Sequence, residues 1–96
     1  SIMKANEFIK KFGWGTSKFC LDNCLSPNDK WFMHEGESIY DEDFDELKRL
    51  VESHEIIQKD FESVEMADYE HMISGCYSDP YWIRVKQAIA DVESCQ

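Results

Sequence analysis

The longest regular pattern of hydrophobic and polar positions lies between Asp41 and Asp60. Apolar positions recur there at intervals of three and four residues, the spacing of one face of an amphipathic helix. This stripe comprises Phe44, Leu47, Leu50, Val51, His54 and Ile57. The remaining faces carry mostly acidic residues, and five acids crowd the first turns, where the helix dipole favours negative charge. The pattern predicts one long helix with an apolar stripe and an anionic back.

Shorter patterns precede this helix. Residues 4–12 predict a helix that ends at Gly13, and residues 16–24 predict a second helix after a Gly-Trp-Gly turn, with Thr16 or Ser17 as its N-cap. Residues 30–34 and 38–40 are rich in aromatic and β-branched residues and flank Glu35, Gly36 and Glu37. This arrangement predicts a small β-hairpin between the second helix and the long one.

Two further helices are predicted after the long one. Ser63 is a candidate N-cap for a helix through Ile73, and Gly75 follows its end. Asp79 followed by Pro80 is a typical helix start, and the helix is expected to run to about Ser94. We expect the first of these helices to be partly buried at Val64, Met66, Ala67, Met72 and Ile73, and the second to bury a stripe of Trp82, Val85, Ile89 and Val92.

These elements predict a mainly α fold with a small β-hairpin (α+β), a compact single domain of four to five helices. Ninety-six residues with 43% hydrophobic content suffice for one small packed domain. Within it we expect residues 1–2 to be a cloning remnant or variable leader before Met3. Residues 3–40 would form a helix-turn-helix-like half with the hairpin, and residues 41–96 an acidic helical half.

The formal net charge is −10, and it is unevenly distributed. Residues 35–70 hold fourteen acids against three bases, a net charge of −11, so the rest of the chain is close to neutral. Charge of this sign and size argues against DNA or an anionic membrane as a direct partner and favours a basic protein surface. The simpler interpretation is that the acids only keep a small protein soluble.

The cysteines and histidines offer a weak case for a metal site. Cys20 and Cys24 are four residues apart and would share a helical face. Completing the site would need another ligand from among His34, His54, His71 and Cys76, and the spacing matches no zinc signature. Because free cysteines are often simply buried, we interpret this pair as structural and predict no metal and no cofactor.

No sequence motif marks a catalytic group. His54 lies on the apolar stripe of the long helix, where a core or boundary histidine is the simpler interpretation. No serine or cysteine stands in a context that would make it the nucleophile for a histidine base. We therefore expect a non-enzymatic protein without catalytic residues.

The order helix, glycine turn, helix, hairpin in residues 3–40 is also that of a winged helix-turn-helix. This half contains Lys4, Lys10, Lys11 and Lys18, but the candidate recognition helix offers only Lys18 and carries Asp22. Arginine, the commonest base-reading residue, is absent before Arg49. A small DNA-binding transcriptional regulator is therefore the alternative hypothesis rather than the first.

Three segments carry a family resemblance: MKANEFIKKFGW (3–14), ELKRLVESHEII (46–57) and QAIADVESCQ (87–96). They resemble small accessory proteins from the early, non-essential regions of lambdoid phages and enterobacterial prophages. The resemblance implies a protein made in the cytoplasm of an infected bacterium, where cysteines stay reduced, and one that redirects or blocks a host factor. It supplies no functional residue. No apolar run approaches the 18 residues of a membrane span.

The functional hypothesis is a phage-type accessory protein that binds and inhibits or redirects a host protein through an acidic face edged by aromatic residues. Carboxylates on a helix can approach the linear charge density of duplex DNA, so DNA mimicry is one form of this hypothesis. Exposed Trp and Tyr would be natural hot spots. The candidate partner-binding residues are Asp41, Glu42, Asp43, Asp45, Glu46, Glu52, Glu55, Trp31 and Tyr40. The sequence leaves the partner's identity and the oligomeric state open.

Overall fold

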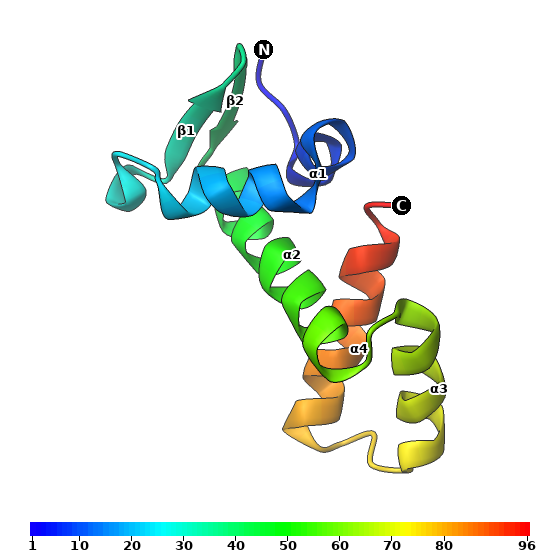
Figure 1. The fold of residues 1–96 in the computed structure, drawn as a ribbon. Coiled ribbons are helices and arrows are strands. Elements are labelled where there is room, and N and C mark those ends of the chain that lie inside the picture. Colours follow the sequence, from blue (N-terminus) through cyan, green and yellow to red (C-terminus); the bar gives the residue numbers. More distant parts are fainter. The chain divides into compact units, whose positions relative to one another are not determined.

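The computed structural model describes all residues 1–96 and confirms a mainly helical α+β fold with one hairpin (Figure 1). The elements are α1 (Ala5–Asp22), a 3-10 turn η1 (Pro27–Asp29), β1 (Trp31–His34), β2 (Glu37–Tyr40), α2 (Asp41–Asp60), α3 (Val64–Ser74) and α4 (Pro80–Glu93). They group into two compact units. The first comprises Ser1–Val51 with Cys95, and the second Glu52–Ser94 with Gln96. The division falls within α2, and each unit is described by itself.

The first helix is bent where the sequence predicts a turn. Gly13 has a φ of +88° and a ψ of 171°, so the helix is kinked there, and helical structure continues on both sides. Ser17 does not act as the predicted N-cap. Its buried hydroxyl donates a hydrogen bond to the carbonyl oxygen of Gly13 at 2.7 Å. This bond satisfies a carbonyl next to the kink.

The predicted hairpin is confirmed, and its turn chemistry fixes its register. Glu35 and Gly36 both have positive φ, 47° and 80°, as a two-residue type I′ turn requires. Strand β1 then pairs antiparallel with β2, with Phe32 opposite Ile39. On the other side of β2, Ile2 forms a parallel bridge with Ser38. Strand β2 is therefore covered on both edges, whereas β1 pairs with another strand on one edge only.

The core of the first unit joins α1, the hairpin and the first half of α2. The buried side chain of Phe8 lies 4.6 Å from Phe12 and 5.4 Å from Phe32 between ring centroids, the latter edge to face. The predicted stripe of α2 is buried in this unit at Phe44, Leu47, Leu50 and Val51. The core cluster consists of Ala5, Phe8, Ile9, Cys20, Phe32, Ile39, Phe44, Leu47 and Leu50.

The second unit is built from the end of α2, α3 and α4. Ser63 and Asp79 are N-caps as predicted, since their side chains accept hydrogen bonds from the backbone N–H groups of Met66 and Tyr81. The apolar residues buried here are Ile57, Phe61, Ala67, Val85, Ala88, Ile89 and Val92. The predicted stripe of α4 is thus confirmed, with Trp82 half-buried at its start.

The predicted burial of α3 is partly wrong. Met66, Met72 and Ile73 are 49%, 58% and 61% exposed, and Ala67 is the buried residue of this helix. A buried alanine presents a small side chain, so α3 needs little apolar surface for packing and leaves its larger side chains in solvent. None of the helices in the chain combines the length and apolar character needed to cross a membrane.

A buried polar network lies within the second unit. Asp91 is 3% exposed, and its carboxylate accepts hydrogen bonds from Ser53 Oγ at 2.6 Å and Gln87 Nε2 at 2.8 Å. Arg84 Nη1 donates to Ser53 Oγ at 3.0 Å. No buried side-chain nitrogen or oxygen lacks a hydrogen-bond partner, so this network meets the usual requirement for polar groups out of water.

Candidate functional site

Two carboxylates at the start of α2 are directed to solvent. Asp41 and Glu42 are exposed and form no ion pair within the chain. Asp41 follows β2 directly and has a φ of 47°, a left-handed conformation that Asp tolerates better than most residues. Its backbone N–H donates to the carbonyl oxygen of Lys30 at 2.8 Å, which extends the hairpin by one further hydrogen bond.

The other predicted acids of this turn are engaged inside the first unit. Asp43 Oδ1 accepts a hydrogen bond at 3.3 Å from the backbone N–H of Ala5, the first residue of α1. Helix α1 has no side-chain cap of its own, so Asp43 is positioned to satisfy one of its orphan donors. Asp45 pairs with Lys30 at 3.0 Å, and Glu46 with Arg49 at 3.6 Å.

The remaining predicted acids belong to the second unit. Glu52 and Glu55 are both exposed on α2, after the point where the units divide. Glu55 acts on its neighbour His54: burial lowers the pKa of His54, and the charge of Glu55 opposes that shift. The nine predicted partner-binding residues are therefore not a single surface within either unit.

Trp31 and Tyr40 form a stacked pair on the hairpin. They are cross-strand partners, and their rings lie 6.0 Å apart between centroids with an interplanar angle of 15°. Both remain partly exposed, at 38% and 39%. Tyr40 immediately precedes Asp41, so the two exposed carboxylates follow the stacked pair along the chain. We call Trp31, Tyr40, Asp41 and Glu42 the acidic–aromatic edge.

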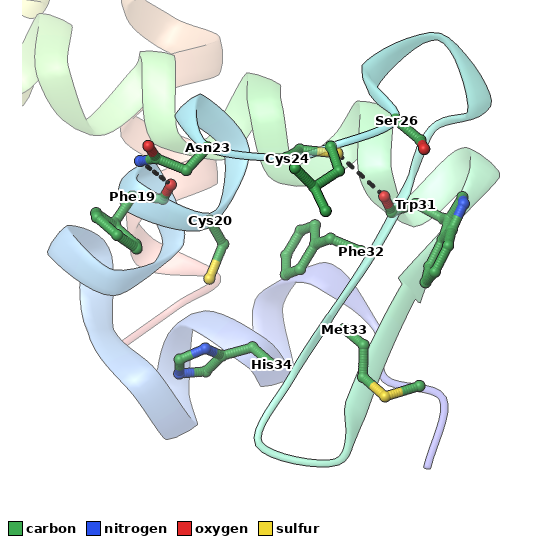
Figure 2. A pocket seen from close by; sticks show the side chains of 10 residues that line it. Phe19, Cys20, Asn23, Cys24, Ser26, Trp31, Phe32, Met33 and His34 are labelled. Atoms are coloured by element: carbon green, nitrogen blue, oxygen red, sulfur yellow. Dashed lines mark hydrogen bonds between the residues drawn. The ribbon is translucent and has the colours of Figure 1, made fainter.

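An apolar groove lies between the end of α1 and strand β1 (Figure 2). Its volume is about 430 Å³, and all four residues of β1 contribute to its wall. Phe19, Leu25 and Met33 line the groove and are 64%, 99% and 60% exposed. The complete lining is Phe19, Cys20, Asn23, Cys24, Leu25, Ser26, Trp31, Phe32, Met33 and His34.

The groove itself was not predicted from the sequence, although Trp31 on its wall was a predicted partner-binding residue. The groove exists because the segment of α1 after Gly13 and the loop that follows it lie beside β1, which is a tertiary arrangement. Phe19, Cys20 and Leu25 are apolar positions of the predicted second helix, and all three line the groove.

Cys20, Cys24 and His34 all line the groove, but they do not converge. No three His, Cys, Asp or Glu side chains in the chain are grouped closely enough to hold a metal ion. Cys24 Sγ donates a hydrogen bond to the carbonyl oxygen of Trp31 at 3.1 Å (Figure 2), and the ring of His34 packs edge to face on Phe12. Burial raises the pKa of Cys20, which favours the thiol over the metal-binding thiolate.

Two lysines of the helix-turn-helix-like half lie close to carboxylates of the same half. Lys18, the cation of the candidate recognition helix, lies 3.5 Å from Asp22 on the same helix. Lys11 lies 3.9 Å from Glu37 and over the ring of Phe12. The exposed Phe19 shares the helix with Lys18, so this surface is partly apolar.

Comparisons of the chain with protein-family models, with curated proteins and with solved structures find no match. The resemblance to phage accessory proteins therefore stays a prediction.

Proposed function

We propose that this chain is a non-enzymatic interaction protein that binds a basic surface of another protein through its acidic–aromatic edge. The observation that carries the proposal is that two exposed carboxylates without ion-pair partners, Asp41 and Glu42, directly follow Tyr40, whose ring stacks on that of Trp31. Tryptophan and tyrosine are enriched among the residues that contribute most binding energy at interfaces. Unpaired carboxylates favour lysine or arginine on the partner, because burying them unpaired is costly.

The overall charge supports the same class of partner. A net charge of −10 accelerates association with a cationic surface and opposes association with nucleic acid or another copy of an anionic protein. The family resemblance supports a host protein that is inhibited or redirected in an infected bacterium. How the host protein is inhibited then depends on which of its basic surfaces this chain covers.

DNA mimicry is the narrower version of this proposal, and the geometry weighs against it. A DNA mimic needs a row of carboxylates available to the partner. Asp43, Asp45 and Glu46 are engaged within the chain, which leaves Asp41 and Glu42 available in this turn. We therefore favour an ordinary protein interface with a mixed aromatic and acidic character.

Changing the available carboxylates is expected to weaken partner binding about tenfold, or 1.4 kcal/mol at 25 °C. The variant combines Asp41→Asn, which tolerates the left-handed backbone, with Glu42→Lys. The partner is first isolated by affinity capture from bacterial lysate and identified by mass spectrometry. Binding to the purified partner is then measured by calorimetry at two salt concentrations, and the loss should shrink as salt rises.

The matched control makes the same charge change in the second unit, with Asp68→Asn and Glu93→Lys, both at exposed positions. Circular dichroism confirms that both variants are folded. If the folded Asp41/Glu42 variant binds the partner as tightly as the unchanged chain, the acidic–aromatic edge is not the interface. Equal losses in both variants would mean that only net charge matters.

The alternative, a small DNA-binding regulator, is tested by titrating the chain against labelled random duplex DNA. We expect no appreciable binding at moderate salt, because the net charge is negative and Lys18 is paired with Asp22. Fluorescence anisotropy gives the affinity. Tight binding that falls steeply with salt, and that is lost when Lys10 and Lys18 are replaced by alanine, would establish the alternative instead.

A further inference from the structure

The outer edge of β1 carries backbone groups that no strand of this chain pairs. Ser38, the partner of Met33 in the hairpin, turns away from β1: its N–H donates to the carbonyl oxygen of Ser1 and its carbonyl accepts from Met3 N–H, at 2.7 and 2.9 Å. Met33 and Ser38 are therefore a non-hydrogen-bonded pair of the antiparallel ladder. It follows that the N–H and C=O of Met33 point outward from the open edge of β1.

The same alternation sets the other positions of β1. Trp31 is two residues from Met33, so its N–H and C=O point to the same side. Its carbonyl oxygen accepts the hydrogen bond from Cys24 Sγ, which agrees with this direction. The open edge thus offers the N–H of Trp31 and both groups of Met33 at the spacing of an extended strand.

The open edge borders the apolar groove, and Cys24 contacts it at the carbonyl oxygen of Trp31. Natural edge strands are commonly blunted by lysine, proline or a bulge. The four residues of β1 are Trp, Phe, Met and His and include none of these. All four line the groove together with Phe19 and Leu25. Figure 2 shows Phe19 on the helical side of the groove, across from β1. The groove volume of about 430 Å³ is in the range of sites that accept small ligands or side chains.

We propose that β1 is a strand-addition site: an extended segment of the basic partner pairs with the backbone of Trp31 and Met33 and places an apolar side chain in the groove. Backbone pairing gives affinity in this mode, and the groove gives side-chain selectivity. The inference rests on the proposed function, because it assigns a conformation to the partner segment that the acidic–aromatic edge attracts.

Charge decides between the two natural occupants of an open edge, another copy of this chain and a foreign peptide. Two copies would each carry −10 and repel one another. A foreign segment that alternates apolar and basic residues is attracted instead by the net negative charge of the chain. The occupant is therefore a cationic extended segment of a partner protein.

The test selects twelve-residue peptides from a random displayed library against the full chain. We expect the selected sequences to alternate apolar residues with lysine or arginine. Amide chemical-shift changes of the labelled chain should centre on Trp31, Met33 and the groove. Met33→Pro removes an outward N–H donor at a position where an edge strand tolerates proline, and it should weaken binding at least tenfold. Met33→Ala keeps the donor and should cost a few-fold.

A second measurement does not depend on folding of the proline variant. Peptides methylated on alternate backbone nitrogens are titrated against the unchanged chain. Because a strand added to β1 uses only one side of its backbone, one alternating set should lose at least tenfold in affinity and the other should bind nearly normally. If both sets of methylated peptides bind equally well, or lose affinity equally, strand addition is wrong. It is also wrong if the library yields helical peptides or yields no binding peptide.

The outcomes separate this inference from the proposed function. If the Asp41/Glu42 variant loses peptide binding but the Met33→Pro variant does not, strand addition is wrong and the acidic–aromatic edge remains the proposed interface. If Met33→Pro abolishes peptide binding and the Asp41/Glu42 variant binds normally, the open edge of β1 pairs with a strand but the proposed basic partner is wrong. A dimer of the chain alone that Met33→Pro dissociates would make a second copy the occupant and overturn the proposal.

Discussion

Replacing Phe8 with alanine is expected to lower the free energy of unfolding by about 3–5 kcal/mol, the usual cost of removing a buried phenylalanine. Phe8 is fully buried, and its ring contacts those of Phe12, Phe32 and His34. It therefore joins α1 to the inner face of the hairpin. Since small domains are stable by only about 5–15 kcal/mol, much of the stability of the first unit would be lost.

Urea denaturation followed by circular dichroism and tryptophan fluorescence measures this loss. The control is Phe19→Ala on the same helix. The side chain of Phe19 is 64% exposed, so its replacement should lower the free energy of unfolding by no more than about 0.5 kcal/mol. A cost below 1 kcal/mol for Phe8→Ala would mean that the contact between α1 and the hairpin does not hold the unit together.

Reversing the charge of Asp91 is expected to cost about 3–5 kcal/mol, as for other broken buried charge networks. An Asp91→Lys variant removes the acceptor for Ser53 and Gln87 and places an ammonium group near Arg84. Asp91 is an acid in a chain rich in acids, but it is 3% exposed rather than part of a solvated face.

Thermal and chemical unfolding report the effect, and Glu93→Lys on the same helix is the control. Glu93 is exposed, so its reversal should change stability by no more than about 0.5 kcal/mol. The Asp91→Asn variant keeps the shape of the side chain and one acceptor oxygen, so its loss of stability should lie between those of Asp91→Lys and Glu93→Lys. A reversal at position 91 that is as harmless as the one at position 93 would show that the network contributes nothing to the fold.

Local sequence signals predicted the secondary structure well because its causes are local. The bounds of α2 follow from one uninterrupted stripe, and those of α3 and α4 from the caps Ser63 and Asp79. The hairpin follows from its aromatic strands and the glycine in its turn. Each of these signals acts within a few residues, so a single sequence displays it.

The candidate site was only partly predictable because its geometry depends on contacts between distant segments. Nothing near Asp43 in the sequence shows that its carboxylate receives the N–H of Ala5, 38 residues earlier. Likewise, the ion pair of Asp45 with Lys30 reduces the available charge of the acidic turn only once the hairpin is folded. The acids and aromatics are visible in the sequence, but which carboxylates have partners within the chain is decided only by the fold.

The hydrogen-bonded network of Ser53 and Asp91 also restricts how α2 and α4 can slide along one another within the second unit. Apolar side chains alone tolerate small shifts, because one aliphatic contact can replace another at similar free energy. A shift of one helical turn, about 5.4 Å, would take the Ser53 hydroxyl on α2 away from the buried Asp91, which would lose this donor and keep the hydrogen bond from Gln87 on its own helix. The network therefore fixes the register of the two helices: it selects one alignment from several that the hydrophobic stripes alone would permit.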